Sequence, residues 1–194
     1  MQSKLEYISS LIKNRRSIGP HMFNNIPVAD DIINTALENA TWAPNHKKTE
    51  PWKFHVMKGS AKNRLGIWAG EALEKYTPEG KFNPLKQKKL IEKITLSSHV
   101  VALIFQRNPE SGLPEWEEIA AFSMAVQNFW LSLEAANVVG YWSSPAAVID
   151  NYSEYVALDV GQQCLGLFYL GYKKKEIQIS SKREPLSLKV RWTE

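Results

Sequence analysis

Residues 43–54 read APNHKKTEPWKF and connect an expected helix to an expected strand. The helical pattern ends before Pro44, and an alternating apolar pattern begins at Trp52. Between them lie six consecutive hydrogen-bonding side chains: Asn45, His46, Lys47, Lys48, Thr49 and Glu50. Pro51 restricts the residue before it, so Glu50 is expected in an extended conformation. A loop between two packed elements is held in place while its polar groups can face a ligand. The simpler alternative is a solvent-exposed connection.

The elements on both sides of this loop follow from apolar spacing. Upstream, Asp30 or Asp31 is expected to cap a helix. Its apolar side carries Ile32, Ile33, Ala36, Leu37 and Ala40. Downstream, residues 52–57 predict a strand, and Ser60 is expected to cap a helix that continues to Tyr76. A short N-terminal helix is predicted from the spacing of Leu5, Ile8, Leu11 and Ile12.

The second half of the chain predicts two buried strands and one long helix. Residues 99–106 (HVVALIFQ) are a nearly continuous apolar run, which is typical of a central strand covered on both faces. Residues 114–138 predict a helix that is apolar nearly all round, so part of it is expected to pack against a second subunit. Residues 164–172 predict another apolar strand, in which Gly166 and Gly171 indicate a bulge or the close approach of another backbone or a ligand.

Two local patterns indicate further helix starts. Pro84 after Asn83 suits the first turn of a helix. Asn151 with Glu154 has the spacing of a capping box. Because the strands are few and separated by helices, the chain is expected to form an α+β or α/β layered domain.

Length and composition indicate one folded domain spanning residues 1–194. The chain has 44% hydrophobic and 11% aromatic residues, including seven Trp, which argues against disorder. Its single cysteine, Cys164, excludes an intramolecular disulfide. The N-terminus lacks a signal-peptide pattern, and the longest apolar run, 100–105, is too short to span a bilayer. We therefore expect a cytoplasmic protein without a membrane partner.

The net charge of +4 favours an anionic partner without identifying it. The Lys and Arg residues are spread over many segments, and no nucleic-acid motif accompanies them, so a nucleic-acid partner is not expected. The chain also lacks the glycine-rich dinucleotide fingerprint, the phosphate loop and the nucleophile elbow. His55 and His99 occur in strand patterns and are interpreted as structural, and Cys164 as a small buried hydrophobe. No histidine has metal-ligand spacing, so no metal is predicted.

The remaining polar residues form a distributed set. Arg15, Arg16 and Ser17 follow the first helix, where two guanidiniums and a hydroxyl suit a phosphate. An equally simple interpretation is that these cations offset the helix dipole. An aromatic-hydroxyl sequence, Tyr141-Trp142-Ser143-Ser144, is expected to be a turn. Lys182 and Arg183 lie near the C-terminus.

Taken in order, these motifs resemble the nitroreductase family of FMN-dependent flavoproteins. The family's R-[RH]-S motif corresponds to Arg15-Arg16-Ser17, and its A-P…Q-P-W-x-F motif to residues 43–54, where Asn45-His46 match the small-nitroreductase variant. Its G-x-x-W-x-[ST] turn corresponds to Tyr141-Trp142-Ser143-Ser144. Its G-x-x-x-L-G-Y strand falls on residues 166–172, and its [KR]-R-x-P motif on residues 182–185. The resemblance spans essentially the whole chain.

The resemblance implies a three-layer α/β/α fold with a mostly antiparallel central sheet, in an intertwined homodimer with two FMN sites at the subunit interface. The C-terminal segment, about residues 173–194, would extend onto the partner subunit. NAD(P)H would donate hydride through FMN to a nitroaromatic, quinone or related flat acceptor. The alternatives are a reductive dehalogenase or enone reductase on the same fold, or a non-catalytic flavin-binding sensor.

The flavin carries the chemistry in this interpretation, so no catalytic side chain is predicted. The expected cofactor-binding residues are Arg15, Arg16, Ser17, His46, Glu50, Trp142, Ser143, Ser144, Lys182 and Arg183. Three positions depart from the common family motif: Asn45 stands where it has Ser, Lys48 where it has Asn, and Glu50 where it has Gln. A carboxylate at position 50 would repel a reduced anionic flavin unless it faces away or a cation such as Lys48 offsets it.

Overall fold

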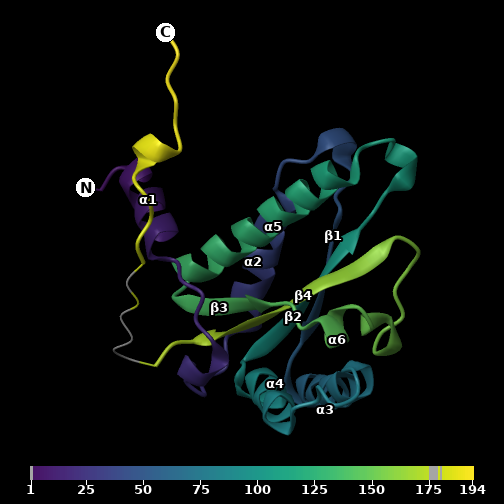
Figure 1. Ribbon diagram of the computed structural model, residues 1–194. Helices are drawn as coiled ribbons and strands as arrows, with labels where there is room; N and C mark the ends of the chain where they lie inside the picture. The colour runs from purple at the N-terminus through teal and green to yellow at the C-terminus, as the bar shows by residue number, and fades with distance from the viewer. Residues whose placement is uncertain (1, 175–178, 180) are drawn as a thin grey trace.

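A four-stranded sheet forms the centre of the computed structural model, which describes residues 2–174, 179 and 181–194 (Figure 1). The strands are β1 (Trp52–Met57), β2 (His99–Gln106), β3 (Val138–Ser143) and β4 (Gln162–Tyr172). They lie in the order β1-β2-β4-β3, and every neighbouring pair is antiparallel. The predicted limits of β1 and β2 are confirmed, and β4 begins slightly earlier than predicted.

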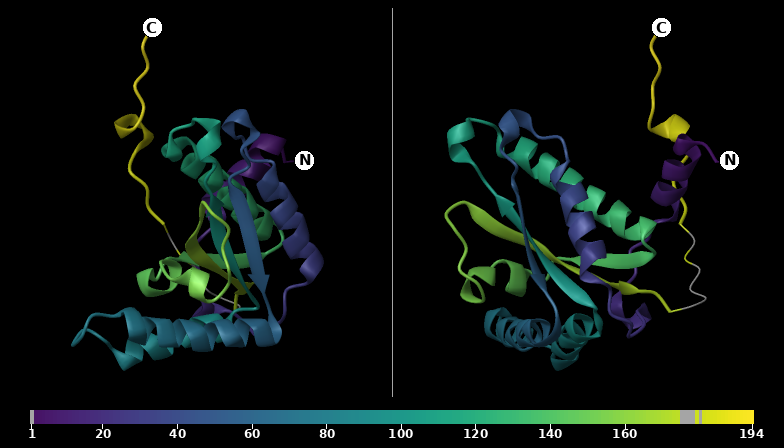
Figure 2. Two further views of the ribbon diagram at one scale, coloured as in Figure 1. Left: turned by 90° about the vertical axis from the view of Figure 1, so that its right-hand side faces the viewer. Right: turned by 180° about the vertical axis from the view of Figure 1, so that it is seen from behind.

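Helices cover both faces of this sheet (Figure 2). They are α1 (Lys4–Asn14), α2 (Asp30–Thr41), α3 (Gly59–Tyr76), α4 (Pro84–Leu96), α5 (Glu115–Ala135) and α6 (Ala146–Ile149). Short 3₁₀ turns occur at Pro20–Met22, His46–Lys48, Pro109–Ser111, Tyr152–Glu154 and Leu186–Leu188. Among the described residues, no helix is both long and apolar enough to cross a membrane.

The alternation of side chains along β2 separates two cores. Val101, Leu103 and Phe105 pack with α2 and α5 on one face of the sheet. Val100 and Ala102, which point the other way, pack with α3 and α4. Since both faces of β2 are covered by helices, the predicted three-layer α/β/α fold with a mostly antiparallel sheet is confirmed.

Several predicted helix starts are wrong by a residue or more. Ala29 and Lys58, not Asp30 or Ser60, occupy the N-cap positions of α2 and α3, and neither side chain makes a capping hydrogen bond. Asp30 instead pairs with Lys58 and His99. The predicted capping box at Asn151 is also absent, because Asn151 Nδ2 donates to the Ala147 carbonyl at 3.0 Å.

Two other caps agree with physical expectation. Asn83 caps α4, with its side chain accepting from the Leu85 N–H, as the Asn-Pro pattern predicted. Ser3 and Glu6 form a complete capping box at the start of α1, which was not among the predicted caps.

The long helix is shorter than predicted, and a strand follows it. α5 runs from Glu115 to Ala135, and Val138 is already the first residue of β3. The sequence Tyr141-Trp142-Ser143 therefore lies in an edge strand and not in the predicted turn. β3 pairs with β4 along its whole length, so its formation depends on a partner distant in sequence.

Of the effects predicted for the interior glycines of β4, the bulge is confirmed, but the close neighbours are side chains and not the predicted backbone or ligand. The β2–β4 register shifts between Leu103 and Ile104, where the chain forms a bulge. A Cβ on Gly166 would lie 2.0 Å from Trp142 Nε1, and one on Gly171 would lie 2.8 Å from the Phe23 ring. Both positions therefore require glycine because another side chain approaches the backbone closely.

The C-terminal segment leaves the sheet after β4, and its last residues stand clear of the body of the molecule (Figures 1 and 2). Part of the segment predicted to reach a second subunit, residues 175–178 and 180, lies outside the described residues. In residues 181–194 the side chains of Leu186, Leu188 and Trp192 are largely exposed.

Candidate functional site

The loop between α2 and β1 has an unusual backbone. Lys47, Lys48 and Glu50 have φ values of 54°, 52° and 43°, and only one other non-glycine residue in the described part of the chain, Asn137, has positive φ. Such conformations are costly for side-chain-bearing residues and persist where the surrounding structure imposes them. The expectation of an extended Glu50 is wrong, because its carbonyl accepts from the Trp52 N–H at 2.7 Å in a tight turn.

Three side-chain contacts impose this conformation. His46 Nδ1 lies 2.8 Å from Glu117 Oε2 in the first turn of α5. Lys47 Nζ donates to the Ser111 carbonyl at 2.6 Å, and the Glu50 N–H donates to Asn45 Oδ1 at 3.1 Å. Because His46 uses Nδ1 for this contact, Nε2 is the ring atom with which it could reach a ligand. Glu117 carries no functional signal in the sequence, because acidic residues are common in the first turn of a helix.

A buried ion pair formed by the next residue, Glu118, holds Glu117 in position. Glu118 is 1% exposed and pairs with Arg107, at the end of β2. Glu118 Oε1 also accepts from the Asn108 N–H at 3.2 Å, and Arg107 Nη2 donates to the Leu113 carbonyl at 2.7 Å. These contacts fix the first turn of α5, and with it the partner of His46.

A second group of predicted site residues lies near the C-terminal half of α5. The Arg15 guanidinium stacks over the Trp130 ring, 4.4 Å from its centroid. Its Nη1 is buried and has no hydrogen-bond partner among the described residues. Burial lowers the pKa of Arg15, which Arg16 and Arg183 lower further while Glu134 opposes them. The positive charges of Arg16 and Arg183 thus both act on Arg15, which favours an anion beside it.

Arg16 has a different environment from Arg15. Its guanidinium donates to the carbonyls of Ile179 at 3.1 Å, Lys13 at 2.5 Å and Arg15 at 2.8 Å. It therefore ties the C-terminal segment to the end of α1. Ser17 is exposed and its backbone bridges Gly140 of β3, which brings the Arg-Arg-Ser motif beside that strand.

The other predicted site residues occupy β3 and the C-terminal segment. Trp142 is half-buried, and its Nε1 donates to the Leu165 carbonyl at 3.1 Å. Ser143 ends β3 and Ser144 follows it, exposed. Lys182 and Arg183 are exposed, and Arg183 Nη1 donates to the Lys182 carbonyl at 3.0 Å.

Helix α5 separates the predicted residues into two groups within one chain. His46 contacts Glu117 at its start, whereas Arg15 contacts Trp130, thirteen residues later. At 1.5 Å per residue these contacts are about 20 Å apart along the helix. The fold therefore brings Arg15, Arg16 and Arg183 together, but it leaves His46 and Glu50 at the other end of α5.

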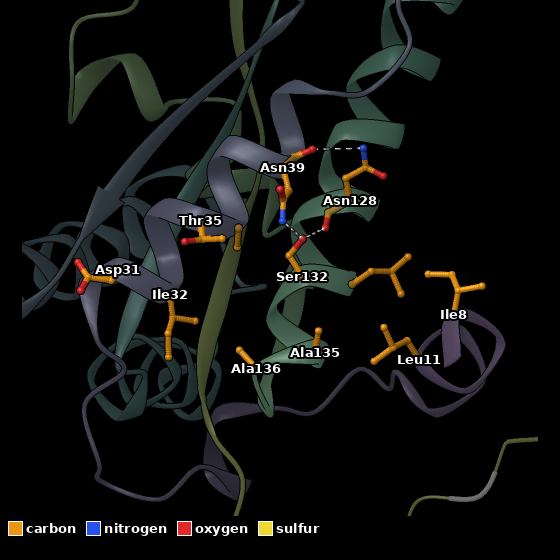
Figure 3. A pocket seen from close by; sticks show the side chains of 12 residues that line it. Ile8, Leu11, Asp31, Ile32, Thr35, Asn39, Asn128, Ser132, Ala135 and Ala136 are labelled. Carbon is orange, nitrogen blue, oxygen red and sulfur yellow. Dashed lines mark hydrogen bonds between the residues drawn. The ribbon is translucent and has the colours of Figure 1, made fainter. Parts of the chain in front are cut away.

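An apolar groove lies between α1, α2 and α5, beside the second group (Figure 3). Its volume is about 670 Å³, and its lining includes Ile8, Leu11, Ile32 and Ala135. Three of its polar residues bond to one another: Asn39 Nδ2 donates to Ser132 Oγ at 3.0 Å, and Ser132 Oγ donates to the Asn128 carbonyl at 2.8 Å. The groove thus presents mainly apolar surface.

The remaining histidines and the cysteine have structural environments. His55 Nδ1 lies 2.7 Å from the Tyr152 hydroxyl, and buried His99 lies 3.3 Å from Asp30. Burial lowers the pKa of both histidines and raises the pKa of Cys164 to about 12. Cys164 is buried as predicted, and each histidine has a hydrogen-bond partner, as expected of a structural residue. In the described part of the chain, no group of three His, Cys, Asp or Glu side chains could hold a metal ion.

Comparison with known proteins gives consistent matches. A family model described as the nitroreductase family matches residues 12–172. YfhC of Bacillus subtilis, named as a putative NAD(P)H nitroreductase, is 27% identical over 184 residues, covering 92% of this chain and 90% of YfhC. Iodotyrosine deiodinase of Hydra vulgaris is 27% identical over 188 residues, 89% of this chain and 68% of that protein. The crystal structure of the FMN-dependent nitroreductase NfnB from Mycobacterium smegmatis, in complex with NADPH, superposes with a TM-score of 0.78 at 19% identity, covering 98% and 100% of the two chains.

Proposed function

The chain belongs to the nitroreductase family, and on that premise we propose that it is an FMN-dependent oxidoreductase that uses NAD(P)H. FMN would accept hydride from NAD(P)H and deliver it to a nitroaromatic, quinone or related flat acceptor. The observation that supports this most directly is the cluster of Arg15, Arg16 and Arg183 with a buried, unpaired Nη1 on Arg15. An unpaired buried donor beside other cations is the arrangement that a phosphate group would satisfy.

In this proposal, some of the predicted binding residues contact the phosphate of FMN and the others contact its flavin ring or ribityl chain. Arg15, Ser17, Lys182 and Arg183 would bind the phosphate through charge-assisted hydrogen bonds. Arg16 would act mainly by holding the C-terminal segment in place, since its donors already bind three carbonyls. His46 Nε2 and the Trp142-Ser143-Ser144 segment would contact the flavin ring or the ribityl chain.

We further propose that the protein is a homodimer in which each flavin site uses both subunits. The two groups of site residues lie about 20 Å apart along α5 in one chain, so the second group would meet the His46 loop of another copy. α1 has no buried residue in the isolated chain, and Leu5 and Ile12 on it are 74% and 50% exposed. A second copy, including its C-terminal segment, would cover this helix and the adjacent apolar groove.

A more specialised activity is the second candidate. The similarity to iodotyrosine deiodinase, over 89% of this chain, favours reductive removal of a halogen from an aromatic substrate as that alternative. The groups described above would bind FMN in the same way for either acceptor, so the acceptor has to be identified by turnover.

The proposal predicts a yellow protein that binds FMN and is bleached by NADH or NADPH under anaerobic conditions. The reduced protein should then be reoxidised by members of a panel containing a nitroaromatic, a quinone and a halogenated tyrosine. Reoxidation by the halogenated tyrosine alone would favour the second candidate. Bound FMN that neither NADH nor NADPH reduces would identify a flavin-binding sensor. A protein that takes up no FMN would refute the proposal.

Changing Glu50 to Gln should leave FMN affinity within about twofold of the original, as expected for an exposed position. Glu50 contributes to the loop through its backbone N–H and carbonyl, which glutamine retains. FMN binding is measured by quenching of flavin fluorescence. Lys48→Gln is the matched control for loss of a charge in the same loop. Loss of flavin in Glu50→Gln but not in Lys48→Gln would show that the carboxylate faces the cofactor.

A further inference from the structure

Arg15 is held mainly by an aromatic surface. Its Cζ lies 4.4 Å from the centroid of the Trp130 ring, and no side-chain hydrogen bond of Arg15 occurs among the described residues. A guanidinium that stacks on an indole is attracted by the ring while its N–H edges remain available. Stacking therefore fixes the plane of the guanidinium and leaves its donors for another group.

Trp130 is itself fixed by the core. Its ring meets Phe168 edge to face, with centroids 5.0 Å apart and an interplanar angle of 89°. Phe168 lies on β4, is fully buried, and makes a similar contact with Phe129 at 5.2 Å. Because the Trp130 side chain extends from α5 and packs against Phe168 of the sheet, its ring is held rigidly and can support the guanidinium.

The charges around the stack indicate what the free donors of Arg15 would bind. Glu134 lies one helical turn after Trp130 and is the acidic group that interacts with Arg15, while Lys173, Arg15 and Arg16 are the cations that act on Glu134. Arg16 and Arg183 add positive charge next to Arg15. The surroundings are therefore net cationic, and the unpaired donors of the Arg15 guanidinium suit the oxygens of a phosphate.

We propose that Trp130 is a positioning residue that holds the Arg15 guanidinium for the phosphate of FMN and thereby makes the protein prefer FMN to riboflavin. This inference rests on the proposed function, because it concerns the binding of the same flavin. Trp130 would not contact the flavin itself; its effect would pass entirely through Arg15.

The test measures the dissociation constants of FMN and riboflavin by fluorescence quenching for two substitutions of Trp130. Trp130→Leu keeps an apolar side chain and removes the aromatic face, and FMN binding should weaken about tenfold. Riboflavin binding should stay within about twofold, since riboflavin has no phosphate. Trp130→Phe keeps an aromatic face and should restore most of the preference for FMN.

A double-mutant cycle separates positioning from packing. Arg15→Gln should weaken FMN binding more than Trp130→Leu does, and adding Trp130→Leu to Arg15→Gln should then have no further effect. Arg15→Lys, which does not disturb the core, should bind FMN about as weakly as Trp130→Leu, because an ammonium group lacks the planar, stacked fork. This variant tests the inference even if Trp130→Leu fails to fold.

Several results would overturn the inference. Equal weakening of FMN and riboflavin in Trp130→Leu would mean that Trp130 only packs, as would additive effects of the two substitutions. Unchanged FMN binding in both Trp130→Leu and Arg15→Lys would mean that the stack has no part in binding. If the unmodified protein binds neither FMN nor riboflavin, the proposed function fails as well, which distinguishes that outcome from failure of this inference alone.

Discussion

Replacing Arg107 with methionine is expected to lower the free energy of unfolding by about 3–5 kcal/mol, the cost of leaving a buried charge without its partner. Glu118 is 1% exposed, and Arg107 is the cation that pairs with it. In the variant Glu118 would have only the Asn108 N–H to stabilise its charge, so it would either remain as a costly carboxylate or take up a proton. Chemical denaturation at neutral pH measures the loss.

The surface pair Lys88–Glu92 provides the control. These side chains are 3.9 Å apart and largely exposed, so Lys88→Met should change stability by less than about 0.5 kcal/mol. Adding Glu118→Leu to Arg107→Met should recover much of the stability, because the buried pair is then replaced by apolar groups. If Arg107→Met costs no more than Lys88→Met, the ion pair does not support the first turn of α5.

This ion pair also shows why part of the site could not be predicted. Glu117 and Glu118 are adjacent acidic residues at the start of a helix, where carboxylates are common because of the helix dipole. Their partners, His46 and Arg107, lie 71 and 11 residues earlier in the chain. Spacing along a sequence reports neighbours on one element, whereas these contacts depend on how β2 and the loop pack against α5.

Dependence on distant contacts also explains why the sequence predicts some strands better than others. β1 and β2 carry alternating or continuous apolar patterns of their own, and their limits were predicted to the residue. β3 is an edge strand whose first residues, Val138 and Val139, continue the apolar pattern of α5. Its extended conformation comes from pairing with β4, so the local sequence indicated first a helix and then a turn.

The candidate cofactor residues were predicted by their motifs, and their roles stay predictions. What the fold adds is proximity: it brings Arg15, Arg16 and Arg183 together from opposite ends of the chain. Trp130 was not singled out from the sequence, because a tryptophan in an apolar helix gives no sign that an arginine stacks on it. The positive φ angles of Lys47 and Lys48 gave no local signal either, since neither residue type favours that conformation.

Gly166→Ala is expected to destabilise the protein by about 3 kcal/mol, through overpacking and a broken hydrogen bond. The added Cβ would lie 2.0 Å from Trp142 Nε1 and 3.0 Å from the Ser143 carbonyl oxygen. The indole would have to move, and its hydrogen bond to the Leu165 carbonyl would be lost. Thermal unfolding should show a melting temperature lower by roughly 6–12 °C.

Gly66→Ala is the matched control, since it adds the same methyl group at a buried glycine. Gly66 lies inside α3, where a Cβ would meet Ile94 Cγ2 at 3.4 Å, an ordinary contact. Alanine is preferred to glycine within a helix, so this variant should be unchanged or more stable by about 0.5–1 kcal/mol. A loss of stability in Gly166→Ala with no loss in Gly66→Ala would locate the constraint at Trp142. The displaced indole should also shift the tryptophan fluorescence of Gly166→Ala but not that of Gly66→Ala. Equal stabilities of the two variants would mean that the Trp142 indole can move away from β4 at little cost. Its position would then not be fixed well enough to shape a flavin site.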